Sequence, residues 1–279
     1  MMRAELIKLA RRPRTWASLA LLCGIPVLVA VFVAVTHLVP PPGQGPALLS
    51  AVLSSGSLFP AAALAIVLPI FLPVAVAVMA GDSVAGEASA GTLRYLLVRP
   101  AGRTRLLAAK LVAMMVYVLA AVVLIALTAY VTGLLLFGSQ PVGVSSSGLT
   151  SLAATSLSGS GLTLTQILLR TLGAVAFIAT SMLGVGAIAL FLSTVTDSSL
   201  GAALGALAAL VVSEVLVTLN SAAAVSPYLP TRYWLAWADF FRQPILWRSI
   251  ERGFAVQAVY AAVFLAAAWA HFATKDVTS

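Results

Sequence analysis

Two carboxylates in this sequence of 279 residues occupy positions at which ionised side chains do chemistry. Glu87 lies in a short charged stretch between two long apolar runs, and Glu214 lies inside an apolar run. If that run crosses a membrane, an ionisable group within it indicates a functional site and requires a partner. Arg170, at the start of the preceding run, is the nearest candidate by depth. We therefore expect Glu214 to form a structural ion pair, to snorkel, or to contact a cationic substrate.

Residue patterns typical of enzymes and metal sites are absent from the sequence. It contains no Gly-Lys dipeptide, and therefore no Walker A loop, and it has neither a His-Glu-x-x-His pair nor a Gly-x-Ser-x-Gly elbow. Its two histidines, His37 and His271, are far apart, and one cysteine, Cys23, cannot build a disulfide or a thiolate cage. We predict no catalytic residues, no metal site and no cofactor bound by this chain.

The composition excludes a soluble enzyme. Hydrophobic residues make up 61% of the sequence and charged residues 9%, whereas soluble domains carry about 25% charged residues. A water-soluble fold with this composition would expose large apolar patches. The net charge of +8 resides in short connectors between uncharged runs. We therefore attribute the basic balance to membrane topology and expect no nucleic-acid partner.

The elements that position these groups are apolar runs long enough to cross a bilayer. A hydrocarbon core about 30 Å thick requires roughly 20 residues of helix. Six runs qualify: residues 16–38, 59–79, 106–137, 167–192, 200–219 and 254–272. Pro69 and Pro73 predict kinks in the second. The sequence thus predicts an all-α integral membrane protein, with one transmembrane domain over residues 1–279.

The distribution of lysine and arginine predicts the orientation. With six spans and an internal N-terminus, 11 of the 16 basic residues would lie in cytoplasmic segments, in agreement with the positive-inside rule. Both termini and residues 80–105 would then be cytoplasmic, and residues 220–253 would lie outside.

The N-terminal residues 1–14 are amphipathic at helical spacing. Met2, Leu6 and Leu9 fall on one side, and Lys8, Arg11 and Arg12 fall on the other. Such a helix lies along the membrane surface. Two alternatives remain: a basic flank that only sets topology, and a lever that acts against a cytoplasmic partner.

Residues 80–105 predict a short helix between the second and third spans. Thr92 is a candidate N-cap and Pro100 a stop, and Leu93, Leu96 and Leu97 form an apolar face between them. The face suits docking into a cleft of a soluble partner, and a surface helix without a partner is the alternative. Glu87 would hold this loop through Arg94, Arg103 or Arg105, or would be a solvated charge.

This stretch resembles a known family. Glu87-Ala-Ser-Ala-Gly91-Thr92-Leu93, followed by Leu96-Leu97, Arg99-Pro100, Arg103 and Lys110, is similar to the signature of the permease subunits of ABC-2 type exporters. Ala101 and Gly102 depart from it, because many members carry Val or Ile and then Ser there. The predicted layout of an amphipathic N-terminal helix and six spans is also similar, and the C-terminal residues 275–279 look like those of bacterial members.

The resemblance implies a function, partners and site residues. The chain would be the permease of an exporter of hydrophobic or amphiphilic substrates in a bacterial inner membrane, paired with a second permease copy or a homologue. ATP and Mg would bind a separate ATP-binding cassette subunit. Coupling to that subunit would fall to Glu87, Gly91, Thr92, Leu93, Leu96, Leu97, Pro100 and Arg103. An ion-coupled secondary transporter and a non-transporting scaffold are the alternatives.

The outer connector 220–253 is both aromatic and charged. Trp234, Trp237 and Phe241 fall at i, i+3 and i+7, which predicts a short helix at the outer interface, where tryptophan rings anchor. The family's re-entrant helices imply a second interpretation, an outer gate that a lipophilic substrate passes. With Glu214, these residues are the candidates for the substrate path.

The charge distribution makes a direct prediction about topology. In a Cys23→Ser background, a cysteine at Ser147 should react with a membrane-impermeant maleimide in intact cells, and a cysteine at Ala101 should react only after permeabilisation. The reverse pattern would refute the orientation.

Overall fold

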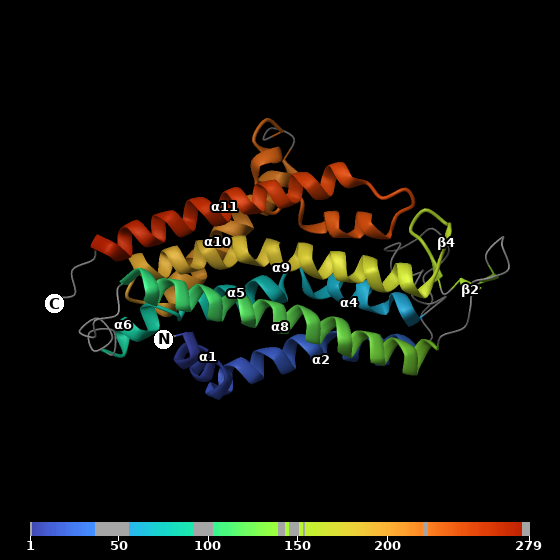
Figure 1. The fold of residues 1–279 in the computed structure, drawn as a ribbon, viewed down its shortest axis with the longest axis horizontal. Coiled ribbons are helices and arrows are strands. Elements are labelled where there is room, and N and C mark those ends of the chain that lie inside the picture. Colours follow the sequence, from blue (N-terminus) through green and yellow to red (C-terminus); the bar gives the residue numbers. More distant parts are fainter. Residues whose placement is uncertain are drawn as a thin grey trace.

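The chain folds into a bundle of long helices that run side by side along one axis (Figure 1). The computed structural model describes residues 2–36, 56–91, 103–138, 143–144, 151–152, 154–219 and 223–274. The long helices are α2 (Pro13–Thr36), α8 (Arg103–Phe137), α9 (Leu164–Val195), α10 (Ser199–Thr218) and α11 (Trp247–Thr274). Each of these five is long and apolar enough to cross a membrane. The prediction of a mostly helical, multi-pass membrane protein is confirmed.

The predicted second span is broken in its middle. It consists of η1 (Gly56–Leu58), α4 (Phe59–Val67) and α5 (Phe71–Gly81), and the two halves are bent by 58°. Pro69 and Pro73 lack the amide hydrogens that would continue the helical hydrogen bonds, which explains the break. Figure 1 shows α4 and α5 end to end along the bundle, and the pair makes a sixth candidate span if its two halves form one crossing.

The two ends of the bundle differ. Helix α1 (Met2–Arg11), helix α6 (Ala85–Ser89) and the end of α11 lie at one end (Figure 1). Two short antiparallel pairs lie at the other: β1 (Gly143–Val144) with β2 (Ser151–Leu152), and β3 (Ala154–Thr155) with β4 (Gly161–Leu162). The predicted helix at 93–97, and the labelling positions 101 and 147, lie outside the described residues.

Helix α9 is the centre of the bundle and packs against α5, α8, α10 and α11. Its start carries a capping box, in which the Thr163 hydroxyl accepts from the Gln166 amide and the Gln166 side chain accepts from the Thr163 amide. Helix α10 follows at once, because Ser198 caps its first turn by accepting from the Gly201 amide. Only residues 196–198 separate α9 from α10.

The aromatic segment of the outer connector is a 3₁₀ helix, η4 (Trp234–Phe241), preceded by η3 (Ser226–Tyr228). Its aromatic face packs inward against α9 and α11, and Trp237 is completely buried. In a 3₁₀ helix, residues three apart share a face, which places Trp234, Trp237 and Phe240 together in the core. The predicted anchoring of these rings in the membrane interface is wrong, because they fill the interior of the bundle.

One close helix contact depends on glycine. A Cβ built on Gly133 of α8 would lie 2.4 Å from the Gly56 carbonyl oxygen and 2.6 Å from the Cβ of Phe59. The start of the broken span therefore lies directly on α8. A backbone atom cannot swing aside as a side chain can, so any larger residue must separate the helices.

We predict that Gly133→Ala lowers stability by about 1–3 kcal/mol, the usual cost of forcing an extra carbon into a packed contact. Thermal unfolding of the purified chain in detergent measures the effect. Gly24→Ala in α2 is the matched control, because a Cβ there meets nothing within 4 Å. Equal melting temperatures for the two variants would contradict the contact.

Candidate functional site

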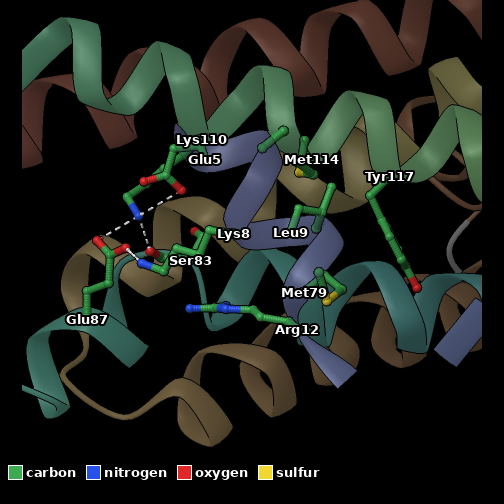
Figure 2. Close-up of a pocket in the computed structure, with 11 residues that line it drawn as sticks. Glu5, Lys8, Leu9, Arg12, Met79, Ser83, Glu87, Lys110, Met114 and Tyr117 are labelled. Carbon is green, nitrogen blue, oxygen red and sulfur yellow. Dashed lines mark hydrogen bonds and ion pairs between the residues drawn. The ribbon is translucent and has the colours of Figure 1, made fainter. Parts of the chain in front are cut away.

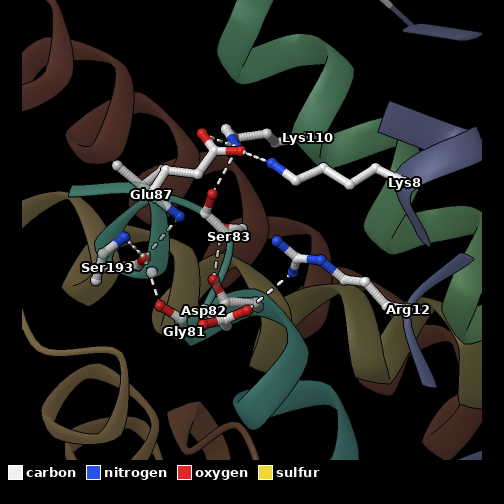
Figure 3. A network of polar contacts seen from close by, with 12 residues as sticks. Lys8, Arg12, Gly81, Asp82, Ser83, Glu87, Lys110 and Ser193 are labelled. Carbon is white, nitrogen blue, oxygen red and sulfur yellow. Dashed lines mark hydrogen bonds and ion pairs between the residues drawn. The ribbon is translucent and has the colours of Figure 1, made fainter. Parts of the chain in front are cut away.

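Six charged side chains meet at the α6 end of the bundle. We call this set the charge cluster; its members are Glu5, Lys8, Arg12, Asp82, Glu87 and Lys110. They come from α1, the α1–α2 junction, the α5–α6 segment and α8, and Figure 3 shows most of them converging. Three acids and three bases balance formally, so the cluster brings four segments together without a net charge.

The centre of the charge cluster is a buried ion pair between Glu87 and Lys110. Lys110 Nζ lies 2.7 Å from Glu87 Oε2, and the two side chains are 2% and 3% exposed. The same ammonium group also donates to the Ser83 carbonyl. The expected partners of Glu87 were Arg94, Arg103 or Arg105, or solvent. The observed partners are lysines, because the second turn of α8 lies directly above α6.

Helix α1 completes the site from the opposite side. Lys8 Nζ donates to Glu87 Oε1, and Glu5 Oε2 lies 3.9 Å from Lys110 Nζ. Figure 2 shows both side chains, with Leu9, directed from α1 into a small cavity of about 50 Å³. Residues 2–11 form the predicted amphipathic helix. Lys8, on its basic side, pairs with the buried carboxylate of Glu87 and remains partly exposed.

A second ion pair joins α1 to the end of α5. Arg12 Nη1 donates to Asp82 Oδ2 at 2.8 Å. Gly86 leaves room for this carboxylate, since a Cβ there would lie 2.2 Å from Asp82 Oδ1. Both acids of the α5–α6 segment thus pair with N-terminal bases: Glu87 with Lys8 of α1, and Asp82 with Arg12, which follows α1.

Ser193 of α9 holds α6 from below the charge cluster. Its hydroxyl donates to the Gly81 carbonyl at 2.6 Å and accepts from the amides of Ala85 at 2.9 Å and Val84 at 3.1 Å. The end of one helix and the start of the next leave such groups unsatisfied, and one buried hydroxyl serves both (Figure 3). Sequence reasoning missed this residue, because a lone serine at the end of a span carries no recognisable pattern.

The charge cluster determines the protonation state of Glu87. Burial would raise the pKa of its carboxyl, but the ion pair and hydrogen bond with Lys110, followed by those with Lys8, outweigh burial and hold the pKa below its ordinary value. Glu87 is therefore ionised at neutral pH and keeps its attraction for both lysines.

The remaining predicted coupling residues lie next to the charge cluster or outside the described part of the chain. Gly91 follows α6 with a φ of +66°, a left-handed conformation that favours glycine and ends the helix. Arg103 is the first residue of α8. Thr92, Leu93, Leu96, Leu97 and Pro100 lie outside the described residues.

The predicted substrate-path residues separate into two groups. Glu214 and Trp234 line one cavity of about 520 Å³ beside the break between α4 and α5. Trp237 and Phe241 are buried in the core, so they do not form an exposed gate. The predicted ion pair between Glu214 and Arg170 is wrong. Arg170 donates instead to the Arg242 carbonyl at 3.1 Å, because η4 lies against the outer part of α9.

Comparison with known families gives one assignment. Residues 49–278 match the model of a family described as a protein of unknown function, DUF2705. The chain belongs to this family. A comparison with curated proteins found no match.

The DUF2705 region includes the α5–α6 segment, α8 and α10, and therefore contains Asp82, Glu87, Lys110 and Glu214. Glu5, Lys8 and Arg12 precede the matched region. The charge cluster thus joins the DUF2705 region to an N-terminal helix that precedes the matched residues. Among the described residues, no group of three or more His, Cys, Asp or Glu is arranged to hold a metal ion. The chemistry available at the charge cluster is ion pairing.

We predict that Glu87→Ala destabilises the chain by about 3–5 kcal/mol, because it leaves Lys110 buried without its principal counter-ion. Thermal unfolding in detergent measures the loss. The double variant Glu87→Ala/Lys110→Met removes both charges and should recover much of it.

Asp239→Ala is the matched control, because its pair with Arg242 is partly exposed, with Arg242 48% accessible. Such pairs contribute about 0–1 kcal/mol. If the Glu87→Ala and Asp239→Ala variants have the same melting temperature, the buried ion pair does not stabilise the α6 end of the bundle.

Proposed function

We propose that this chain is the permease subunit of an ABC-2 type exporter, which forms the path for ATP-driven efflux of a hydrophobic or amphiphilic substrate. The observation that carries the proposal is the Glu87–Lys110 ion pair. These two residues flank the segment 92–102, which bears most of the family-like motif. Their pairing ties the two ends of that segment together, so a force applied to it acts on α5–α6 and α8 at once.

The charge cluster is suited to transmit such a force. Glu87 is bonded to Lys8 of α1 and to Lys110 of α8, and Ser193 bonds the start of α6 to α9. Close ion pairs in a buried setting resist separation more than exposed ones do. A push from a soluble partner would therefore displace the ends of several spans as one unit.

The break in the second span is a point at which that displacement could change the shape of the bundle. Helices α4 and α5 meet at 58°, next to the cavity that Glu214 and Trp234 line. A bend of this kind permits one half of a span to move while the other stays packed. In this proposal the cavity belongs to the substrate path, and ATP and Mg bind a separate ATP-binding cassette subunit. A second permease copy or a homologue completes the assembly in a bacterial inner membrane, with both termini cytoplasmic.

One observation favours a second candidate, an ion-coupled secondary transporter. Such transporters place coupling carboxylates beside interrupted helices near the bilayer midplane, and Glu214 lies beside the α4–α5 break. Transport driven by an ion gradient without ATP, and insensitive to vanadate, would identify that candidate and exclude the exporter.

We predict that Leu96→Asp/Leu97→Asp abolishes association with the ATP-binding cassette subunit that the proposal requires. Burying two leucines contributes roughly 3–6 kcal/mol, so their replacement should weaken binding more than a hundredfold. Co-purification, vanadate-sensitive ATP hydrolysis and export are measured together.

Tyr95→Asp/Val98→Asp is the matched control, because at helical spacing these positions lie away from the Leu93, Leu96 and Leu97 face. It adds the same charge and should keep the complex. ATP hydrolysis by the isolated chain, or full export by the leucine variant, would overturn the proposal. A chain that binds no ATPase and transports nothing would be a scaffold.

A further inference from the structure

The cavity beside the break in the second span has the size and lining of a ligand site. Its volume is about 520 Å³, within the range of roughly 300–1,000 Å³ that small-molecule sites occupy. Leu68, Pro69 and Ile70 form one wall, α10 forms the second, and the segment 231–235 forms the third. Most of the lining is aliphatic, so the cavity suits an apolar or amphiphilic occupant.

Two opposite charges face this apolar space. Glu214 comes from α10 and Arg232 from the segment before η4, and both side chains are exposed. In the described part of the chain, neither forms an ion pair or a side-chain hydrogen bond. A few charged groups that line an apolar cavity orient a ligand and give it specificity. A ligand that carries the two complementary charges would pair with both.

A second cavity extends the first along α5. It has a volume of about 390 Å³ and shares Ile70 and Val74 with the first. Ile70 is 63% exposed and Val74 39%, so the two cavities adjoin along α5, between α2 and α10. The second cavity is lined mostly by apolar side chains and, at its other end, by Arg12, Arg14 and Asp82. The apolar walls match alkyl chains, and Glu214 and Arg232 in the first cavity match the two charges of a zwitterionic head group.

We propose that these adjoining cavities bind a zwitterionic phospholipid, with the ammonium group at Glu214 and the phosphate at Arg232. A cationic amphiphile would leave Arg232 unpaired, and an anionic lipid would leave Glu214 unpaired. A soluble zwitterion would not use the apolar walls. Only the statement that this lipid is the transported substrate class rests on the proposed function. Binding of the lipid requires no ATPase.

The test is native mass spectrometry of the purified full chain with three lipids of equal chain length: phosphatidylethanolamine, phosphatidylglycerol and a dialkyl trimethylammonium lipid. The wild type should retain phosphatidylethanolamine most tightly. Glu214→Gln and Arg232→Gln should each weaken that binding roughly tenfold or more, as expected for loss of one charge-assisted hydrogen bond. Glu251→Gln and Arg248→Gln, exposed on α11 and outside both cavities, are the matched controls and should bind as wild type does.

Each alternative result overturns the proposal in a distinct way. Loss of binding only in Glu214→Gln, with preference for the cationic lipid, would identify a cationic amphiphile. Loss only in Arg232→Gln, with preference for phosphatidylglycerol, would identify an anionic lipid. Equal binding by all variants would place the lipid elsewhere. Because binding is measured without nucleotide, lipid retention without ATP-driven export would refute the exporter and leave the lipid site intact.

Discussion

Burial of the Lys110 ammonium group is the constraint on which the α6 end of this protein depends. A charge removed from water is tolerated only when counter-charges and hydrogen-bond acceptors surround it. Glu87, Glu5 and the Ser83 carbonyl meet that requirement. Because these groups come from α1 and the α5–α6 segment, and Lys110 comes from α8, satisfying one ammonium group determines where these three segments lie.

The same ion pair, between Glu87 and Lys110, also helps to hold α6 in place. Glu87 is held from above by two lysines, and the backbone at both ends of the preceding turn is held from below by the Ser193 hydroxyl. The left-handed Gly91 then ends the helix and redirects the chain. A five-residue helix has little stability of its own, so its position is a property of its neighbours. That arrangement is consistent with an element that transmits motion between its neighbours.

Along the long helices, apolar packing rather than ion pairing holds the bundle together. Trp237, Phe177 and Phe241 fill the space between α9, α11 and η4. Two adjoining cavities lie beside the α4–α5 break. The protein thus combines a tightly paired charged end with two adjoining, mostly apolar cavities, and the bent span connects the two regions.

The sequence alone determined the class and the approximate crossings of this protein. Long uncharged runs can be stable only in a membrane, and backbone hydrogen bonding makes them helices, so the five long apolar helices and the proline-broken pair α4–α5 were predictable from composition and length. The partners of individual side chains were not. Glu87 pairs with Lys8 and Lys110, which are 79 and 23 positions away, because helices from distant parts of the chain meet there. Spacing along one helix carries no information about which residue lies opposite on another. The inward turn of the aromatic segment was likewise decided by tertiary structure, since Trp234 and Trp237 are equally suited to an interface and to a core. Only the space left between α9 and α11 determined which environment they occupy.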